Sequence, residues 1–268
     1  MPTNTDDEIN PHLNSSDAND LDIPGLKEIL WHKMRDDLKA YIPDIASTDL
    51  LMCPTCCRFL PFEGFSVEHI IPKQSLADDP ASVREAIPAN KRAATTLLCN
   101  KRLLIKGKTV YDNGCNSWKG RFYDKFLRAI FNTNVMKKNN FTSRHHVALF
   151  CAGYLGLFAD YGFQITLVPS GLVMRRQFFN PNKFNPEVPL ECQMALMGAP
   201  DLHYSEETKR YWIPPFKFVA ERNFCIMIVR NASMRLPMSR DPRIPIAREL
   251  PLVPSKYTLR PNFQTFFQ

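Results

Sequence analysis

Four cysteines with metal-ligand spacing constrain this chain more than any other feature of its sequence. Cys53 and Cys56 form a C-x-x-C turn, and Cys99 and Cys115 follow farther along the chain. Such a turn presents two thiolates to one tetrahedral ion, and two more cysteines can complete a closed four-sulfur site. Zinc prefers a closed site when its task is structural, because no position remains for water. We therefore predict a structural zinc ion on these four cysteines, with Cys57 as the alternative to Cys56.

Hydropathy along the chain favours metal binding by these cysteines over disulfide bonds. The first residues are polar and acidic, whereas a secretory signal has a basic start followed by an apolar run. The longest apolar stretch, residues 147 to 159, is only about two-thirds of the roughly 20 residues that a membrane span requires. We therefore expect a cytoplasmic protein with no membrane partner, in which clustered thiols stay reduced.

The net charge of +7 is unevenly distributed along the chain. Residues 91 to 144 carry thirteen Lys and Arg against two Asp, which gives +11, so the rest of the chain is about −4. A basic block suits a polyanionic partner, because each phosphate that Lys or Arg neutralises releases counterions. A charge run is more often only a solvated face. The basic block therefore supports nucleic-acid binding only in combination with the motifs described below.

Hydrophobic periodicity divides the chain into four parts. Residues 1 to 22 are polar and cannot offset the entropy lost on ordering, so they are predicted to form a flexible acidic tail. Residues 23 to 49 contain an amphipathic helix that starts near Leu26 and ends before Pro43. Residues 50 to 136 hold the cysteines and a helix from Arg121 onward. Residues 141 to 268 are predicted to form an α+β domain of unknown role.

The last of these parts contains one long helix and several strand signals. Ser143 to Tyr161 is predicted to be a largely buried helix capped by Ser143, with Gly162 at its end. Residues 163 to 178 have two β-rich runs around Pro169, which is a hairpin signal. Further strands at residues 216–220 and 224–229 complete an antiparallel sheet, and the proline-dotted tail from Pro237 is predicted to be irregular.

Two short motifs lie among the cysteines. The first is Ser66-Val67-Glu68-His69-Ile70-Ile71-Pro72-Lys73, and the second, which contains the last cysteine, is Gly114-Cys115-Asn116-Ser117-Trp118-Lys119-Gly120. A lone Glu-His before Ile-Ile-Pro is more often an ordinary strand histidine. Together with the C-x-x-C turn, however, the order of motifs resembles the HNH endonuclease family, over roughly residues 50 to 130.

This resemblance implies a ββα-metal core, in which a hairpin carries the acid-histidine pair and a helix returns to it. The zinc knuckle would hold the roots of elements that are too small to stand unaided. The resemblance implies that His69 is the general base and needs a neutral ring near working pH. It implies that Glu68 and Asn116 are ligands of one catalytic Mg²⁺ or Mn²⁺, because their side-chain oxygens suit hard cations.

The resemblance also implies DNA as the partner, without excluding RNA. Fifteen residues separate Cys99 from Cys115 where two are usual in the family, and this basic insertion is predicted to be a hairpin that contacts DNA. Lys119 and Arg121 are placed to meet phosphate oxygens near the start of the following helix. The residues predicted to bind nucleic acid are Lys73, Lys101, Arg102, Lys106, Lys108, Lys119 and Arg121.

Two departures from the family pattern concern single positions. The last motif residue is Asn116 instead of His, and an amide oxygen can also bind a hard cation. The middle asparagine of the family has no counterpart, because Ala94 and Thr95 stand there and Asn90 lies farther back. The occupant of this middle position is left unassigned.

The sequence thus predicts a metal-dependent HNH endonuclease that hydrolyses DNA phosphodiester bonds, with a C-terminal domain that can receive a protein partner or activator. The family resemblance associates such nucleases with bacterial defence against phage and plasmids. Two alternatives stay open. One is a catalytically inactive, zinc-stabilised nucleic-acid-binding module, and the other is an interaction subunit whose basic region is merely solvated.

Overall fold

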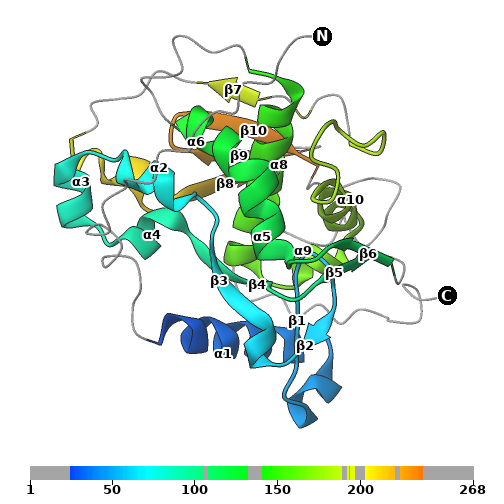
Figure 1. Cartoon of the computed structure of the whole chain (residues 1–268). Coiled ribbons are helices and arrows are strands. Elements are labelled where there is room, and N and C mark those ends of the chain that lie inside the picture. The colour runs from blue at the N-terminus through cyan, green and yellow to red at the C-terminus, as the bar shows by residue number, and fades with distance from the viewer. Residues whose placement is uncertain are drawn as a thin grey trace, which may run out of the picture.

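The structure is a computed structural model that describes residues 25–105, 108–131, 141–188, 192, 194–196, 203–220 and 224–237. Over these residues it is a mixed α+β fold of helices and antiparallel strands (Figure 1). The predicted acidic tail and the segment beyond residue 237 lie outside the described residues. In the part of the chain that is described, no helix combines the length and the apolarity needed to cross a bilayer.

The N-terminal amphipathic helix is confirmed as α1 (Leu26–Lys39), which is followed by the 3-10 helix η2 (Pro43–Ser47). Its apolar positions recur at three-to-four spacing, so one face of the helix is buried. On that face the Trp31 ring meets the rings of Phe62 and Phe65 edge-on, with centroids 5.3 and 5.6 Å apart. These contacts attach α1 to the strand that carries the Glu-His motif.

Three short antiparallel pairs follow. They are β1 (Leu51–Met52) with β2 (Phe59–Leu60), β3 (Phe65–His69) with β4 (Thr95–Cys99), and β5 (Leu103–Ile105) with β6 (Lys108–Tyr111). The 3-10 helix η3 (Phe62–Gly64) precedes β3. The last pair is the hairpin predicted for the insertion between Cys99 and Cys115.

The connection from β3 to β4 is a chain of short helices. They are α2 (Lys73–Ala77), α3 (Ala81–Ala86) and α4 (Ala89–Ala93). A proline stands immediately before each of them, at Pro72, Pro80 and Pro88. Since proline cannot continue a preceding helix, the regular spacing of these three residues divides the connection into separate turns.

A continuous helical run begins at the last cysteine of the cluster. It consists of α5 (Cys115–Lys119), the π-helical turn η4 (Gly120–Asp124) and α6 (Lys125–Phe131). The helix predicted from Arg121 therefore starts earlier than expected. At Gly114 a Cβ atom would lie 2.1 Å from the carbonyl oxygen of Cys99, so the chain passes very close to the end of β4 before it turns into α5.

The C-terminal half is organised around α8 (Ser143–Tyr161), as predicted, although the N-cap is Thr142, which forms a capping box with His145. This helix is buried from Val147 to Phe158, and it packs against β8 and β10 of a four-stranded antiparallel sheet (Figure 1). The sheet has the order β7-β10-β9-β8 and consists of β7 (Met194–Leu196), β8 (Phe216–Ala220), β9 (Cys225–Val229) and β10 (Ala232–Leu236). The short helix α11 (Lys209–Trp212) precedes β8.

The hairpin predicted for residues 163 to 178 is wrong. That segment forms two helices, α9 (Gln164–Leu167) and α10 (Pro169–Gln177). Pro169 occupies the first turn of α10, where its fixed φ is compatible with a helix and its missing N–H costs nothing. A proline that the sequence pattern placed in a β-turn thus begins a helix instead.

One hydrophobic core includes residues from both sides of residue 140. A buried ion cluster adds a polar connection between the short helices and the sheet. The carboxylate of Asp79 contacts the guanidinium of Arg92 and lies 2.8 Å from that of Arg230, and all three side chains are at most 5% exposed. Since Arg230 lies in the turn between β9 and β10, this cluster ties that turn to the β3–β4 connection.

Candidate metal centre and the Glu68-His69 strand

Three of the four predicted zinc ligands meet at the root of the β3–β4 hairpin. The sulfur atoms of Cys53, Cys56 and Cys115 lie within 4.8 Å of one another. Sulfurs bound at about 2.3 Å to one tetrahedral zinc ion are about 3.8 Å apart, so this spacing fits a metal ion after a small contraction. The cysteine cluster, as we call these three residues, can therefore bind a metal ion.

Cys99, the fourth predicted ligand, lies beside the cysteine cluster at the end of β4. Its thiol hydrogen-bonds with the thiols of Cys115 and Cys56, and its backbone N–H donates to Cys53 Sγ at 3.4 Å. The guanidinium of Arg58 donates to Cys99 Sγ at 2.9 Å. The hydrogen bond with Cys115 lowers the pKa of Cys99, but Cys56 and burial outweigh it, so the pKa of this thiol is raised. A metal ion bound here would have to displace its proton.

The thiols of the cluster differ in acidity. Hydrogen bonds from Cys115, Cys53 and Cys99 hold the pKa of Cys56 well below its usual value, whereas burial raises the pKa of Cys53 to about 12. A metal ion would displace the protons that these thiols share, so metal affinity should increase with pH. The alternative ligand Cys57 contacts the guanidinium of Arg175 instead and is not one of the three grouped sulfurs.

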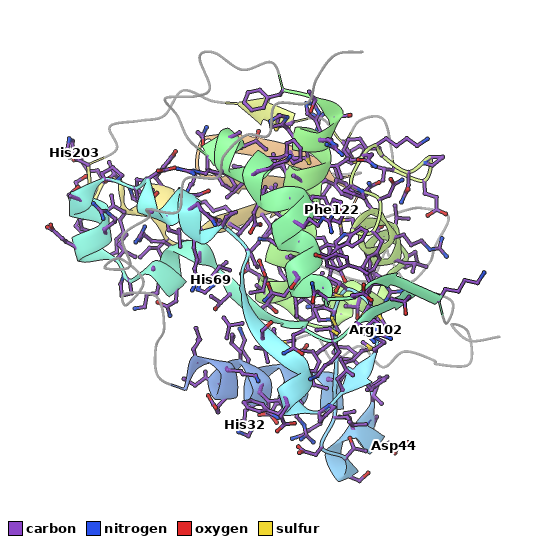
Figure 2. The ribbon with its side chains drawn as sticks, viewed as in Figure 1. His32, Asp44, His69, Arg102, Phe122 and His203 are labelled. Carbon is purple, nitrogen blue, oxygen red and sulfur yellow. The ribbon has the colours of Figure 1, made fainter. Side chains whose placement is uncertain are left out.

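The acid-histidine pair lies at the opposite end of the same hairpin. In the register of the two strands, Phe65 pairs with Cys99, and His69 pairs with Thr95. His69 lies four steps along β3 from Phe65, a length of about 13 Å. Figure 2 labels His69 where β3 leaves the hairpin. A metal ion on the cysteines would hold one end of β3, and the Glu68-His69 end lies away from that ion.

The helix α5 returns to β3 through two polar side chains. The amide nitrogen of Asn116 donates to Ser66 Oγ and to the backbone oxygen of Val67, both at 2.9 Å. These bonds use both amide protons, so Oδ1 is the atom of Asn116 that a cation can use. Asn116 is thereby attached to the strand just before Glu68.

Lys119, one turn farther along α5, joins the same strand through a buried ion cluster. Its ammonium lies 2.6 Å from Glu68 Oε1 and 2.7 Å from Asp124 Oδ1, and it donates to the backbone oxygen of His69 at 3.0 Å. The side chain of Lys119 is 1% exposed. This burial corrects the prediction that Lys119 meets phosphate, because its i+3 spacing from Asn116 places it on the helix face that packs against β3.

In the ion cluster of Lys119, Glu68 and Asp124, one ammonium faces two carboxylates, so the positive and negative charges do not balance. Burial raises the pKa of Glu68 to about 7 against the attraction of Lys119, and Asp124 raises it further. The pKa of Lys119 is also raised, because the two carboxylates outweigh the opposing effect of burial. Since one ammonium serves two carboxylates, we assign the charge to Lys119 and the excess proton near neutral pH to Glu68.

The other predicted nucleic-acid contacts lie at the surface. Arg102 immediately precedes β5, Lys108 begins β6, and both are exposed; Figure 2 labels Arg102. The guanidinium of Arg121 lies over the rings of Tyr111 and Phe122, at 5.7 and 5.5 Å from their centroids. The exposed members of the predicted set are Lys73, Lys101, Arg102, Lys108 and Arg121, and Lys106 lies outside the described residues.

The sequence analysis missed Asp124 as a partner in the ion cluster. An acidic residue five positions after Lys119 does not share its face on a regular α-helix. The π-helical turn from Gly120 to Asp124 widens the helix and brings the two side chains together. Hydrophobic periodicity contains no signal for such a turn, so this contact could only be found in the structure.

Comparison of the chain with protein-family models, with curated proteins and with solved structures finds no match. The chemistry of the site therefore has to be argued from its own geometry. That geometry comprises a cysteine cluster that can hold a metal ion at one end of a hairpin and a Glu-His pair at the other end. A helix that begins at the cluster contacts the strand between them.

Proposed function

We propose that this chain is a metal-dependent endonuclease of the HNH type that hydrolyses phosphodiester bonds of DNA. The contact between α5 and β3 carries the proposal. Asn116 hydrogen-bonds to the backbone of Val67, and Lys119 pairs with Glu68, so the helix that starts at Cys115 meets the strand at its Glu-His motif. The resemblance of residues 50 to 130 implies such a return of the helix to the strand with the acid-histidine pair.

Each proposed role follows from the surroundings of the residue. His69 ends β3 and takes a proton from the attacking water through its imidazole. Its backbone oxygen accepts a hydrogen bond from Lys119, which holds this end of the strand in place. Glu68 and Asn116 offer a carboxylate and an amide oxygen, which are donors that Mg²⁺ and Mn²⁺ prefer. Such an ion, when bound, supplies Lewis-acid polarisation of the scissile phosphate.

The unequal charge of the ion cluster supports cation binding at Glu68. Two carboxylates share one ammonium, and the surplus negative charge is neutralised by a proton that leaves near pH 7. A divalent cation can replace that proton, and the approach of Glu68 to it requires a shift of the carboxylate away from Lys119. We therefore expect cation affinity at this end of the hairpin to increase between pH 6 and pH 8.

Zinc at the cysteine cluster would act structurally. Cys53 and Cys115 are fully buried and Cys99 is surrounded by N–H donors, so no open position for substrate water is expected there. The exposed basic side chains of the β5–β6 hairpin supply phosphate contacts. Bacterial defence against phage or plasmids is the setting that we propose from the family resemblance, with the C-terminal sheet as the surface for a partner or activator.

The test is cleavage of supercoiled plasmid by the full chain with Mg²⁺ or Mn²⁺. We expect nicked and linear products that disappear with chelator, and a rate that falls by about 10²-fold or more in His69→Ala, since general-base catalysis contributes about that much. His32→Ala is the matched control, because His32 is exposed on α1 (Figure 2). Undiminished cleavage by His69→Ala would refute the assigned base.

A second candidate is a zinc-stabilised DNA-binding module without catalysis. The burial of Glu68, which is 5% exposed and already paired with Lys119, favours this candidate. It predicts a salt-sensitive shift of DNA in a gel and no cleavage with any divalent metal. No appreciable DNA binding at physiological salt would instead favour an interaction subunit.

A further inference from the structure

A cavity of about 600 Å³ lies between α1 and the end of α8, and none of the cysteines lines it. Its walls include Leu30 and Met34 of α1, Thr95 and Thr96 of β4, and Phe158 of α8. This volume is within the range of pockets that hold small molecules, about 300 to 1,000 Å³. The cavity belongs to neither the cysteine cluster nor the Glu68–Lys119 ion cluster.

One wall of the cavity is held by a contact between α1 and the turn after α8. The carboxylate of Asp37 accepts a hydrogen bond from the backbone N–H of Phe163 at 2.6 Å. The turn residue Gly162 has φ +70°, and a Cβ atom there would lie 2.2 Å from Asp37 Oδ2. The carboxylate therefore reaches the backbone only because this residue is glycine. Backbone contacts, and not side-chain packing alone, thus define this side of the cavity.

Two deeply buried polar side chains face the cavity with hydrogen-bonding groups to spare. Tyr41 is 3% exposed, and its hydroxyl has no hydrogen-bond partner among the residues that the structure describes. Gln164 is 8% exposed, and its Nε2 donates to the backbone oxygen of Tyr161 at 2.7 Å. Its Oε1 accepts no bond within the same described residues. Neither atom is among the fully enclosed polar atoms of the described chain that lack a partner, so both are open to the cavity and can hydrogen-bond to a polar occupant.

The charges around the cavity are negative in sum. Asp37 and Asp160 line it, and burial raises the pKa of both carboxyls. Lys33 is close enough to both carboxyls to lower their pKa in turn. Asp36 also lines the cavity, but it is paired with Lys39 at 2.7 Å. Two carboxylates and one ammonium leave a single negative charge, which one monovalent cation would balance.

We propose that this cavity binds a small organic monocation, an amine joined to a flat apolar group. The ammonium lies between Asp37 and Asp160 and donates to the hydroxyl of Tyr41 and to Oε1 of Gln164. The apolar group packs on the side chains of α1 and Phe158, where an aromatic wall also favours a cation.

The cavity also lies against β4, the strand that is paired with the Glu-His motif. Thr95 and Thr96 are the register partners of His69 and Glu68 on the facing strand. A bound amine would therefore contact the strand that is paired with the Glu-His motif. The binding proposal itself does not depend on the chemistry proposed for that motif.

The test is calorimetric titration of the full chain with tryptamine, with tryptophol and indole-3-propionate as the neutral and anionic counterparts. We expect tryptamine to bind at least tenfold more tightly than either counterpart. Tyr41→Phe and Asp160→Asn should each weaken tryptamine binding at least fivefold. The matched control is Asp44→Asn, since Asp44 is exposed on η2 and does not line the cavity (Figure 2).

Three results would overturn the proposal. They are no tryptamine binding at millimolar concentration, equal binding of tryptamine and tryptophol, and tryptamine affinity that neither cavity variant changes. None of these measurements involves DNA or a divalent metal. Refutation of the endonuclease proposal would therefore not affect the proposal of amine binding in the cavity, and the reverse also holds.

Discussion

Replacement of Glu68 by glutamine should remove a pH dependence from the stability of the fold. Burial raises the pKa of Glu68 to about 7 from 4.5 in the unfolded chain. Between these values the unfolded state loses its proton while the folded state keeps it. The stability that this group contributes is therefore fully present below pH 4.5 and is lost as the pH rises through 7.

The magnitude follows from the two pKa values. One pKa unit corresponds to about 1.4 kcal/mol, so the contribution of Glu68 should fall by roughly 2 to 3 kcal/mol between pH 5 and pH 8. Glutamine keeps an oxygen that can accept a hydrogen bond from Lys119 but cannot ionise. The free energy of unfolding of Glu68→Gln, relative to the wild type, should therefore increase by that amount over the same range.

The assay is urea unfolding of both proteins at several pH values with equal zinc content. The comparison of two proteins cancels the protonation of the cysteines, which they share. Glu63→Gln is the control, because Glu63 is an exposed glutamate on η3. A stability difference between wild type and Glu68→Gln that stays flat from pH 5 to pH 8 would refute the buried, proton-sharing ion cluster.

Three further substitutions test other contacts of the fold. Lys119→Met leaves two buried carboxylates without their cation and should lower the free energy of unfolding by about 3 to 5 kcal/mol, measured by urea titration. Asp79→Asn leaves two buried guanidinium groups without their carboxylate and should cost about the same, with a drop in melting temperature of several degrees in calorimetry. Tyr154→Phe removes the hydrogen bond to the backbone oxygen of Pro54 and should cost about 1 kcal/mol at pH 7, and unchanged stability would contradict a contact between α8 and the cysteine turn.

The parts of the site that were predicted correctly have short-range signals in the sequence. The C-x-x-C spacing of Cys53 and Cys56 already implies two sulfurs on one side of a turn, and the structure adds Cys115 to them. The helix α1 and the strand β8 follow from apolar residues that repeat with the period of each element. These features depend on residues that are close in the chain.

The errors concern features that long-range packing decides. Lys119 was expected to meet phosphate oxygens near the start of the helix, yet two carboxylates from different elements stabilise it inside. The segment around Pro169 has high β-propensity, yet it forms α10, since tertiary contacts override propensity. The hydrophobic pattern around residue 120 does not predict the π-helical turn that brings Asp124 to Lys119.

We propose that Glu68 and Asn116 hold one catalytic cation at the far end of a hairpin that cysteines anchor. Titration of the zinc-loaded chain with Mn²⁺, followed by electron paramagnetic resonance, tests it most directly. We expect one Mn²⁺ site per chain, whose affinity falls at least tenfold in Glu68→Gln and in Asn116→Ala and is retained in His32→Ala. Absence of Mn²⁺ binding to the wild type, or an affinity that neither variant changes, would contradict it.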